Sequence, residues 1–344
     1  MSFRLAFLEE DHVLGVVRDA LPGPGREAEA RLRDFFSPEP FDPAPLRNAA
    51  RGLALAEAPE EAEAIVIRRT RVDAALLARC PRLRLVQRLG ERHDRIALDA
   101  AATRGIHVSC LPRPSLIRTA EHAILLMLAL AKRLLPADAA VRRGAPGGSS
   151  GSVAYNWPGL GGLGGLHGNT LGIVGLGEVG ALVARRATGF GMRVLYTGRS
   201  RQPEAVEAAC GAQWRDLDAL LAEADIVSLH ASNLPENRGA FGERELRRMR
   251  PGAVLVNVSR GALLDEAALM RVLQDGHLSG AGLDVHGAEP RPAGDPLCAL
   301  PNVVLTPHIA GGSRVSVVAE VERIFENCRA VLAGQPPPHG LVLP

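Results

Sequence analysis

Residues Leu171-Gly-Ile-Val-Gly-Leu-Gly-Glu-Val-Gly180 decide how the larger part of the chain folds. The apolar run 171–174 predicts a buried parallel strand, and helical spacing follows from 179 to 187. Between them, Gly175, Gly177 and Gly180 have the spacing G-x-G-x-x-G. The first glycine permits a tight turn, the second lets backbone approach a pyrophosphate, and the third lets helix and strand pack closely. The stretch therefore predicts a dinucleotide site at the positive end of a helix, against the alternative of a turn that binds nothing.

The composition is that of an ordinary globular chain. Its 344 residues suffice for two domains, and 47% are hydrophobic, so a sizeable core is available. A net charge of +2 argues against nucleic acid as a partner. The five scattered cysteines lack metal-ligand spacing, which favours reduced thiols, no metal site and a cytoplasmic location. Acidic residues 9–11 argue against a signal peptide, and the apolar stretch 123–131 is too short to span a bilayer, so no membrane partner is expected.

Predicted strands and helices alternate on both sides of the glycine stretch. Before it we expect strands at 3–8, 64–67, 83–88 and 105–108, a helix at 73–78, and one long helix at 117–135 between prolines. After it we expect strands at 193–196, 226–229, 253–258, 280–284 and 303–306, and helices at 217–222, 243–249, 266–275 and 314–332. This alternation is typical of an α/β protein with a doubly wound sheet.

Two segments fall outside this alternation. Residues 144–168 are rich in glycine and serine around Trp157, which favours an extended arm. The arm is either a solvated loop or a segment that reaches a partner subunit. The tail from Gly334 is expected to be a surface end.

The turn after the second strand of the nucleotide domain indicates which dinucleotide binds. An acidic residue there usually holds the adenosine ribose, but this chain has Gly198, Arg199, Ser200 and Arg201. The missing carboxylate removes a charge that would repel a 2′-phosphate, and the arginines and the serine hydroxyl can donate hydrogen bonds to it. The turn therefore predicts NADP(H) as the preferred cofactor, with NAD(H) possible. Two solvated arginines and no preference are the alternative.

Three polar residues follow three successive predicted strands. They are Arg260, Glu289 and His308, and the carboxyl ends of such strands are where ligands bind in this type of sheet. Arg260 can hold a carboxylate with a permanent charge, and His308 can exchange a proton near neutral pH. Glu289 would favour the imidazolium form of His308. Singly each residue has a structural explanation, but together they predict an active site.

The sequence resembles the D-isomer-specific 2-hydroxyacid dehydrogenases over about residues 60–335. Besides the glycine stretch, the resemblance rests on Thr119-Ala-Glu-His122, Arg250-Pro-Gly-Ala-Val-Leu-Val-Asn257-Val-Ser-Arg260-Gly261, Gly282-Leu-Asp284-Val and Pro307-His308-Ile. The run Tyr196-Thr-Gly-Arg199 is similar to the NADP-preferring glyoxylate and hydroxypyruvate reductases of that family.

The resemblance implies two Rossmann-like domains. A doubly wound nucleotide-binding domain, residues 113–311, would be inserted in a smaller flavodoxin-like substrate domain, residues 1–112 and 312–344. It also implies that Arg260 holds a 2-keto acid, that His308 is the acid and base, and that Glu289 is its partner. It implies a substrate cleft between the domains and a homodimer formed largely by the nucleotide domain. The implied cofactor contacts are Gly175, Leu176, Gly177, Glu178, Val179, Gly180, Gly198, Arg199, Ser200, Arg201, Pro235, Val258, Asp284 (to the nicotinamide carboxamide) and Gly311.

The expected substrate loop departs from the family pattern. The resemblance implies that backbone N–H groups of Gly90, Glu91 and Arg92 bind the substrate carboxylate, but Arg92 replaces a usual glycine. Arg92 could bind a second acidic group of the substrate, lie in solvent or pair with Glu91, or belong to a remodelled loop. Cys110 replaces a frequent asparagine. His286 stands where an aromatic residue is frequent, and we interpret it as a packing residue.

The leading hypothesis is NAD(P)H-dependent reduction of a small 2-keto acid, of the glyoxylate or hydroxypyruvate type, to the D-2-hydroxy acid. The alternative is an enzyme similar to phosphoglycerate dehydrogenase, acting on a phosphorylated or dicarboxylic substrate. The formate dehydrogenases of the family fit poorly, because they have glutamine in place of Glu289. A non-enzymatic corepressor that senses nucleotide is the less favoured third hypothesis.

Overall fold

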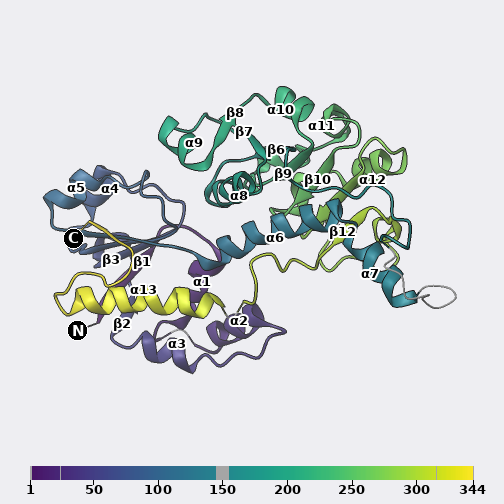
Figure 1. The fold of residues 1–344 in the computed structure, drawn as a ribbon. Helices are drawn as coiled ribbons and strands as arrows, with labels where there is room; N and C mark the ends of the chain where they lie inside the picture. The colour runs from purple at the N-terminus through teal and green to yellow at the C-terminus, as the bar shows by residue number, and fades with distance from the viewer. Residues whose placement is uncertain (1, 24, 145–154, 315, 344) are drawn as a thin grey trace. The chain divides into compact units, whose positions relative to one another are not determined.

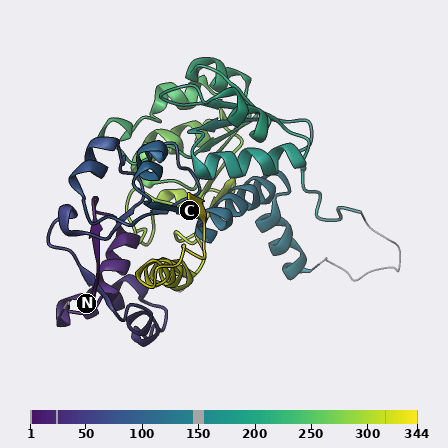
Figure 2. The same cartoon turned by 90° about the vertical axis from the view of Figure 1, so that its left-hand side faces the viewer.

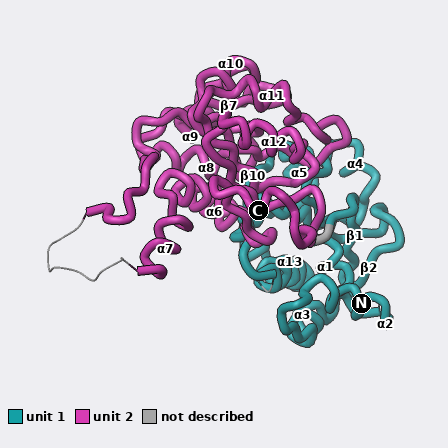
Figure 3. Tube along the Cα trace, turned by 90° about the vertical axis from the view of Figure 1, so that its right-hand side faces the viewer, with its two compact units in different colours: residues 1–115, 312–344 teal, residues 116–311 magenta. Residues whose placement is uncertain are grey.

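The computed structural model describes residues 2–23, 25–144, 155–314 and 316–343. The chain forms two compact units, coloured separately in Figure 3. Unit 1 comprises Met1–Ser115 and Gly312–Pro344, and unit 2 comprises Leu116–Gly311. Unit 2 is therefore an insertion in unit 1, and both ends of the chain belong to unit 1 (Figure 2).

Unit 2 is built on a parallel sheet of seven strands. They are β6 (Thr170–Val174), β7 (Arg193–Thr197), β8 (Ala212–Trp214), β9 (Ile226–Leu229), β10 (Val254–Asn257), β11 (Gly280–Leu283) and β12 (Val303–Leu305). Their order is β8-β7-β6-β9-β10-β11-β12. Counted within the unit this is 3-2-1-4-5-6 with one further strand at the edge, the order of the dinucleotide-binding fold. The predicted fold class is confirmed; the short strand β8 was not predicted.

Helices cover both faces of this sheet (Figure 1). They are α6 (Pro114–Ala131), α8 (Glu178–Gly189), α9 (Glu204–Cys210), α10 (Leu217–Glu223), α11 (Glu243–Arg248) and α12 (Glu266–Gln274). Helix α7 (Leu134–Arg143) belongs to neither of the two apolar clusters beside the sheet. One apolar cluster joins α6, α8 and α9 to the sheet, and a second joins α10, α11 and α12 to its other face. Side chains along a strand point alternately to the two faces, so β7, β9 and β10 contribute to both clusters.

The prediction of one helix over 117–135 is wrong. Arg133 has a left-handed backbone, with φ of 47°, and separates α6 from α7. Pro136 does not end a helix, because it is the third residue of α7. A backbone N–H at this position has no acceptor within the helix, so a proline there removes no helical hydrogen bond. The predicted arm at 144–168 includes residues 145–154, which lie outside the described residues.

Helix α6 packs closely against β11 of unit 2, where two of the strand's residues are glycines. A Cβ at Gly282 would lie 3.0 Å from the Cβ of Leu126, and one at Gly280 would lie 3.2 Å from Leu130. Glycine in β11 therefore lets the helix approach the strand closely. The helix has 18 residues and a mean hydropathy of 1.3, enough by length and composition to cross a membrane, and its buried residues pack into the core of unit 2.

Unit 1 has a six-stranded sheet in the order β13-β5-β4-β3-β1-β2. Its strands are β1 (Phe3–Phe7), β2 (Leu53–Leu55), β3 (Ala64–Ile67), β4 (Leu85–Leu89), β5 (His107–Leu111) and β13 (Leu341–Leu343). Its helices are α1 (His12–Ala20), α2 (Arg26–Phe36), α3 (Ala44–Ala49), α4 (Ala74–Arg79), α5 (Leu98–Thr103) and α13 (Ser316–Leu332). The first five strands are parallel and follow the flavodoxin order 2-1-3-4-5.

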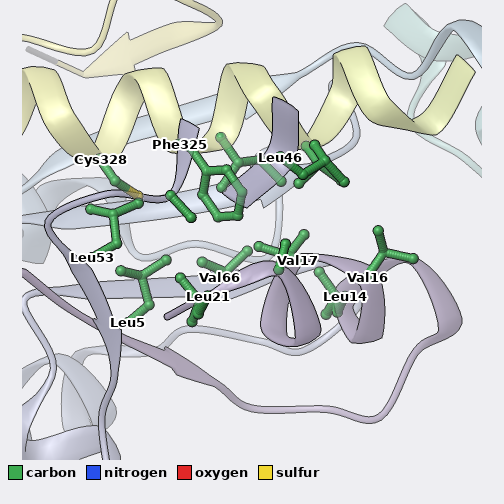
Figure 4. Packing of buried hydrophobic residues seen from close by; sticks show 14 of the residues in the cluster. Leu5, Leu14, Val16, Val17, Leu21, Leu46, Leu53, Val66, Phe325 and Cys328 are labelled. Carbon is green, nitrogen blue, oxygen red and sulfur yellow. The ribbon is translucent and has the colours of Figure 1, made fainter. Parts of the chain in front are cut away.

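The last helix completes the core that the N-terminal strands begin (Figure 4). Phe325 and Cys328 of α13 share one buried cluster with Leu5 of β1, Leu53 of β2 and Val17 of α1. The part of unit 1 that follows the insertion is therefore needed to bury the part that precedes it.

The tail is mostly exposed from Gly334 to Pro338, as predicted, but it continues into a strand that was not predicted. Leu341–Leu343 forms β13, which pairs antiparallel with β5. Asn327 of α13 fixes this tail, because its buried amide donates to Ser109 Oγ of β5 at 3.0 Å and to the His339 carbonyl at 3.0 Å. Its amide oxygen also accepts from the His339 N–H at 3.0 Å.

Candidate functional site

The turn between β6 and α8 has the geometry that a dinucleotide requires. Gly175 has φ of +102°, and a Cβ there would lie 2.9 Å from backbone atoms of His230 and Ala231. A Cβ at Gly180 would lie 2.3 Å from the Gly175 carbonyl oxygen, so only glycine lets α8 pack on this turn. Gly177, the residue before α8, has nothing within 4 Å of its Cβ position. The open space at this helix N-terminus fits a pyrophosphate.

The predicted 2′-phosphate turn lies beside the glycine turn. Gly175 N–H donates to the Thr197 carbonyl at 2.9 Å, and the exposed residues Gly198, Arg199 and Ser200 follow directly. Arg199 Nη1 lies 3.9 Å from Glu236 Oε1, and 70% of the Arg199 side chain is exposed. Arg201 departs from the alternative of two solvated arginines, because Glu207 holds it in an ion pair.

His308 and Glu289 form the pair that the sequence predicts. His308 Nδ1 lies 2.7 Å from Glu289 Oε2. The other carboxylate oxygen accepts from the His286 N–H at 2.9 Å. Partial burial acts to raise the pKa of Glu289, but the hydrogen bonds from His308 and His286 outweigh it and hold that pKa below its usual value. Glu289 is therefore ionised at neutral pH and aligns the imidazole.

A buried carboxylate shapes the turn that carries His308. Both oxygens of Asp284 accept hydrogen bonds from this turn: Oδ1 from Thr306 Oγ1 at 2.6 Å and the Ile309 N–H at 2.9 Å, and Oδ2 from the Ala310 N–H at 2.8 Å. His308 itself is left-handed, with φ of 56°, and donates its N–H to the Asp284 carbonyl at 2.8 Å. Besides its predicted contact with nicotinamide, Asp284 thus fixes an uncommon backbone conformation at a candidate catalytic residue.

Arg260 lies on the neighbouring loop, between β10 and the single turn Gly261–Leu263. Its Nη1 donates to the Ser259 carbonyl at 2.6 Å, and its own carbonyl accepts from Asn257 Nδ2 at 3.0 Å. A Cβ at Gly261 would lie only 1.9 Å from the His286 carbonyl oxygen. The loops after β10 and β11 therefore touch, and this contact brings the Arg260 loop against the loop of Glu289.

Gly261→Ala is expected to lower the free energy of unfolding by about 1–3 kcal/mol, because the added methyl group overlaps backbone that cannot move independently. Thermal unfolding measures this loss, and kcat should fall in the same variant because the Arg260 and Glu289 loops must separate. Gly189→Ala is the matched control, since nothing lies within 4 Å of that Cβ position. Equal stability of the two variants would contradict the close contact at Gly261.

In the predicted substrate loop of unit 1, the Gly90 N–H and the Arg92 side chain already have hydrogen-bond partners within the protein. Gly90 follows β4 with φ of +128°, and its N–H already donates to the Leu111 carbonyl at 2.8 Å. Arg92 pairs with Asp94, not with Glu91: its Nε and Nη2 each lie 3.0 Å from a carboxylate oxygen. Burial raises the pKa of Asp94, but the bonds from Arg92 more than offset this and lower it. Only the N–H groups of Glu91 and Arg92 remain as predicted backbone donors.

The remaining predicted cofactor contacts all lie in unit 2. Leu176 and Val258 are buried in the core of unit 2, Pro235 is exposed at the start of a short turn after β9, and Glu178 and Val179 open α8. Gly311 is the last residue of unit 2.

Arg291 was not predicted from the sequence, and His286, interpreted there as a packing residue, joins it in holding the site. Arg291 donates from Nε to Nδ1 of His286 at 3.2 Å and from Nη2 to Glu266 Oε1 at 2.6 Å. The other ring nitrogen of His286 lies 2.9 Å from the Thr306 carbonyl oxygen. His286 thus ties the loop of Glu289 to the turn of His308. Two partners of Arg291, His286 and Asp295, lie within five residues of it, but Glu266 comes from a separate segment.

This chain is similar to a known protein family and to several characterised proteins. Residues 124–310 match the family model "D-isomer specific 2-hydroxyacid dehydrogenase, NAD binding domain". A glyoxylate reductase from Thermococcus litoralis is 39% identical over 290 residues, 84% of this chain and 86% of that protein. A D-3-phosphoglycerate dehydrogenase from Mycobacterium bovis is 37% identical over 80% of this chain but only 50% of that protein. The crystal structure of a glyoxylate reductase from Paecilomyes thermophila is 29% identical, with a TM-score of 0.56 and coverage of 99% of this chain and 98% of that one.

Proposed function

The chain belongs to the D-isomer specific 2-hydroxyacid dehydrogenases, a family of NAD(P)-dependent oxidoreductases, and we propose that it uses NADPH to reduce a small 2-keto acid of the glyoxylate or hydroxypyruvate type to the D-2-hydroxy acid. The observation that carries this proposal is the hydrogen bond between His308, after β12, and Glu289, after β11, in the unit that also has Arg260 after β10 and the glycine turn.

Each residue of this site has a task that its geometry supports. Arg260 holds the substrate carboxylate and polarises the keto oxygen with a charge that does not titrate away. Because Glu289 engages Nδ1, Nε2 of His308 is the atom that gives a proton to the keto oxygen. The nicotinamide, when bound, supplies the hydride. In the reverse direction the same Nε2 takes the proton, and the ionised Glu289 stabilises the resulting imidazolium.

Two observations favour the glyoxylate type of substrate over a phosphorylated or dicarboxylic one. The match to glyoxylate reductase spans 86% of that protein, whereas the match to phosphoglycerate dehydrogenase spans half. Arg92, which could bind a second acidic group, already has Asp94 as its partner. The Asp94 carboxylate offsets the charge of Arg92 and takes two of its five N–H donors, which weakens the attraction for a second acidic group. Because the family is one of oxidoreductases, we do not propose the corepressor hypothesis.

The proposal is tested by the loss of NADPH or NADH absorbance with a panel of 2-keto acids. Glyoxylate and hydroxypyruvate should be reduced fastest, and NADPH should give the higher kcat/KM. Faster turnover of phosphohydroxypyruvate or 2-oxoglutarate would favour the alternative substrate and assign Arg92 to it. Chiral analysis of the product should give the D isomer where the product has a stereocentre.

Arg199→Ala is expected to raise the KM for NADPH by roughly tenfold and to leave the KM for NADH nearly unchanged, because one charge-assisted contact to a 2′-phosphate is lost. Steady-state kinetics with one 2-keto acid and both nucleotides measure this difference. Arg248→Ala, an exposed arginine on α11, is the control for the loss of a surface charge. Equal effects on both nucleotides would remove Arg199 from phosphate recognition.

We extend the proposal to a homodimer formed by unit 2. Several large apolar side chains of this unit are exposed: Leu134 at 48%, Leu135 at 53%, Trp157 at 43% and Leu163 at 44%. Exposed apolar side chains of this kind favour a protein partner. Trp157→Ala should weaken the dimer by roughly thirtyfold, as expected for a buried tryptophan at an interface, in analytical ultracentrifugation over a range of concentrations. A wild-type chain that sediments as a monomer would contradict the proposal.

A further inference from the structure

A buried polar cluster lies behind the arginine turn at the end of β7. The Tyr196 side chain is fully buried, yet its hydroxyl donates to Glu207 Oε1 at 2.6 Å and accepts from the Gln202 N–H at 2.7 Å. Burial and the neighbouring carboxylate raise the pKa of Tyr196 to about 12, so the hydroxyl keeps its proton. The hydrogen bonds from Arg201 and Tyr196 lower the pKa of Glu207 to about 2. At neutral pH, Glu207 is therefore ionised and the Tyr196 hydroxyl is neutral.

Glu207 fixes the plane of the Arg201 guanidinium. Arg201 Nε lies 2.9 Å from Oε1 and Nη2 lies 2.8 Å from Oε2, so the pair is bidentate. Of the five N–H donors that a guanidinium has, this leaves three for another acceptor. The side chain of Arg201 is 66% exposed while that of Glu207 is only 10% exposed, so the remaining donors are accessible to an anion from solvent.

The same cluster pins the turn that carries Arg199. Tyr196 lies before this turn and Gln202 lies after it, and the hydroxyl of one binds the N–H of the other. The turn therefore cannot open without breaking this bond. It also lies next to the glycine turn, through the bond from Gly175 to Thr197. In a sheet of this order the adenosine ribose binds at this place.

We propose that Glu207 and Tyr196 are positioning residues that set the preference for NADPH, because they hold Arg201 and its turn ready for the 2′-phosphate. This inference rests on the proposed use of NADPH. Neither residue touches the nucleotide: both act through Arg201 and the turn 197–201. Preorganised donors lose less conformational freedom when the phosphate binds, so the gain is confined to the nucleotide that has this phosphate.

A competing explanation makes the opposite prediction. If the Glu207 carboxylate kept Arg201 away from the phosphate, removing its charge would release the arginine and strengthen NADPH binding. The bidentate geometry favours positioning, because it commits one edge of the guanidinium and leaves the rest accessible.

The test uses Glu207→Gln and Tyr196→Phe in the full-length enzyme. Glutamine keeps the size of the side chain and removes the charge, and phenylalanine removes only the hydroxyl. Glu207→Gln should raise the KM for NADPH roughly fivefold to tenfold, as expected for the loss of a charge-assisted contact, and Tyr196→Phe roughly twofold to threefold. The KM for NADH should stay within about twofold in both variants, because NADH has no group for Arg201 to bind. Binding of adenosine 2′,5′-bisphosphate against 5′-AMP, which lacks only the 2′-phosphate, should show the same difference by calorimetry without turnover.

Glu223→Gln is the matched control. Glu223 of α10 accepts from Arg193 and Arg215, and these bonds hold its pKa below the usual value, but it does not contact the arginine turn. This variant should leave the ratio of the two KM values unchanged. Parallel losses for both nucleotides in Glu207→Gln would indicate a merely structural role and overturn the inference. Tighter NADPH binding would overturn it in favour of competition.

The outcome for the wild-type enzyme separates this inference from the proposed function. A wild-type enzyme that prefers NADPH, with a Glu207→Gln variant that keeps this preference, overturns the inference alone. A wild-type enzyme that reduces the 2-keto acid equally well with both nucleotides overturns the NADPH proposal and this inference together, while the reductase activity itself stands.

Discussion

His308→Asn is expected to lower kcat by about a thousandfold, the usual range for the loss of a general acid being about 10²–10⁴. Asparagine cannot give a proton to the keto oxygen near neutral pH. It does tolerate the left-handed backbone of this position, with φ of 56°, better than alanine does. A loss of activity in the asparagine variant therefore reports the missing imidazole and not a collapsed turn. Steady-state kinetics measure kcat, and fluorescence titration should give an unchanged Kd for NADPH.

The chain provides a matched control for this substitution. His339 of unit 1 also pairs with a glutamate, since its Nε2 lies 2.5 Å from Glu326 Oε2. His339→Asn removes a pair of the same kind outside the proposed site, so its kcat should stay within about twofold of the wild-type value, as for most surface substitutions. A similar fall in both variants, or a His308→Asn variant that keeps full activity, would remove His308 from the reaction.

Arg260→Ala is expected to lower kcat/KM by about 10²–10⁴, because two charge-assisted hydrogen bonds to the substrate carboxylate are worth roughly 3–6 kcal/mol together. Arg260→Lys should recover only part of this loss, since an ammonium group keeps the charge but not the planar pair of donors. The loss should appear mainly in the KM for the 2-keto acid if Arg260 binds the carboxylate, and in kcat as well if it also polarises the keto oxygen.

Arg271→Ala is the control for Arg260. Arg271 lies on α12 and pairs with Glu243, with its Nη2 at 2.7 Å from Oε2, on the exposed surface of the same unit. Its substitution should leave kcat/KM unchanged. If Arg260→Ala retained wild-type kcat/KM, another cation would have to hold the substrate.

Much of the fold could be predicted because buried strands have a plain apolar pattern. The predicted strands at 64–67 and 226–229 match β3 and β9 residue for residue. The strands β2, β8 and β13 were missed: each has three residues and lies at the end of its sheet, where tertiary pairing decides, although the equally short β12 was predicted from its apolar run. The break at Arg133 was missed for a similar reason, since nothing in the local sequence demands a left-handed residue there.

The position of the candidate site and the pairing of His308 with Glu289 were predictable, but several other contacts were not. Parallel strands place their carboxyl ends on one edge of a sheet, so Arg260, Glu289 and His308 could be brought together from spacing alone. The partners of Arg201 and Arg92 could not, because each arginine had several carboxylates within reach along the chain. Glu207 and Asp94 were selected by the backbone path of the turns. The use of the Gly90 N–H by the Leu111 carbonyl is likewise a property of the folded loop.

Strand β13 protects the edge of the unit 1 sheet from pairing with strands of other copies of the chain. It occupies the side of β5 that would otherwise present a row of unpaired N–H and C=O groups, and β5 is a buried, apolar strand. Ser109, in the middle of β5, donates its hydroxyl to the His339 carbonyl at 2.7 Å, so the tail is fastened before the strand begins. A chain shortened to end before Leu341 would expose an open sheet edge to other copies, and such an edge is a template for aggregation. Leu341–Leu343 thus protects the edge of the sheet at β5.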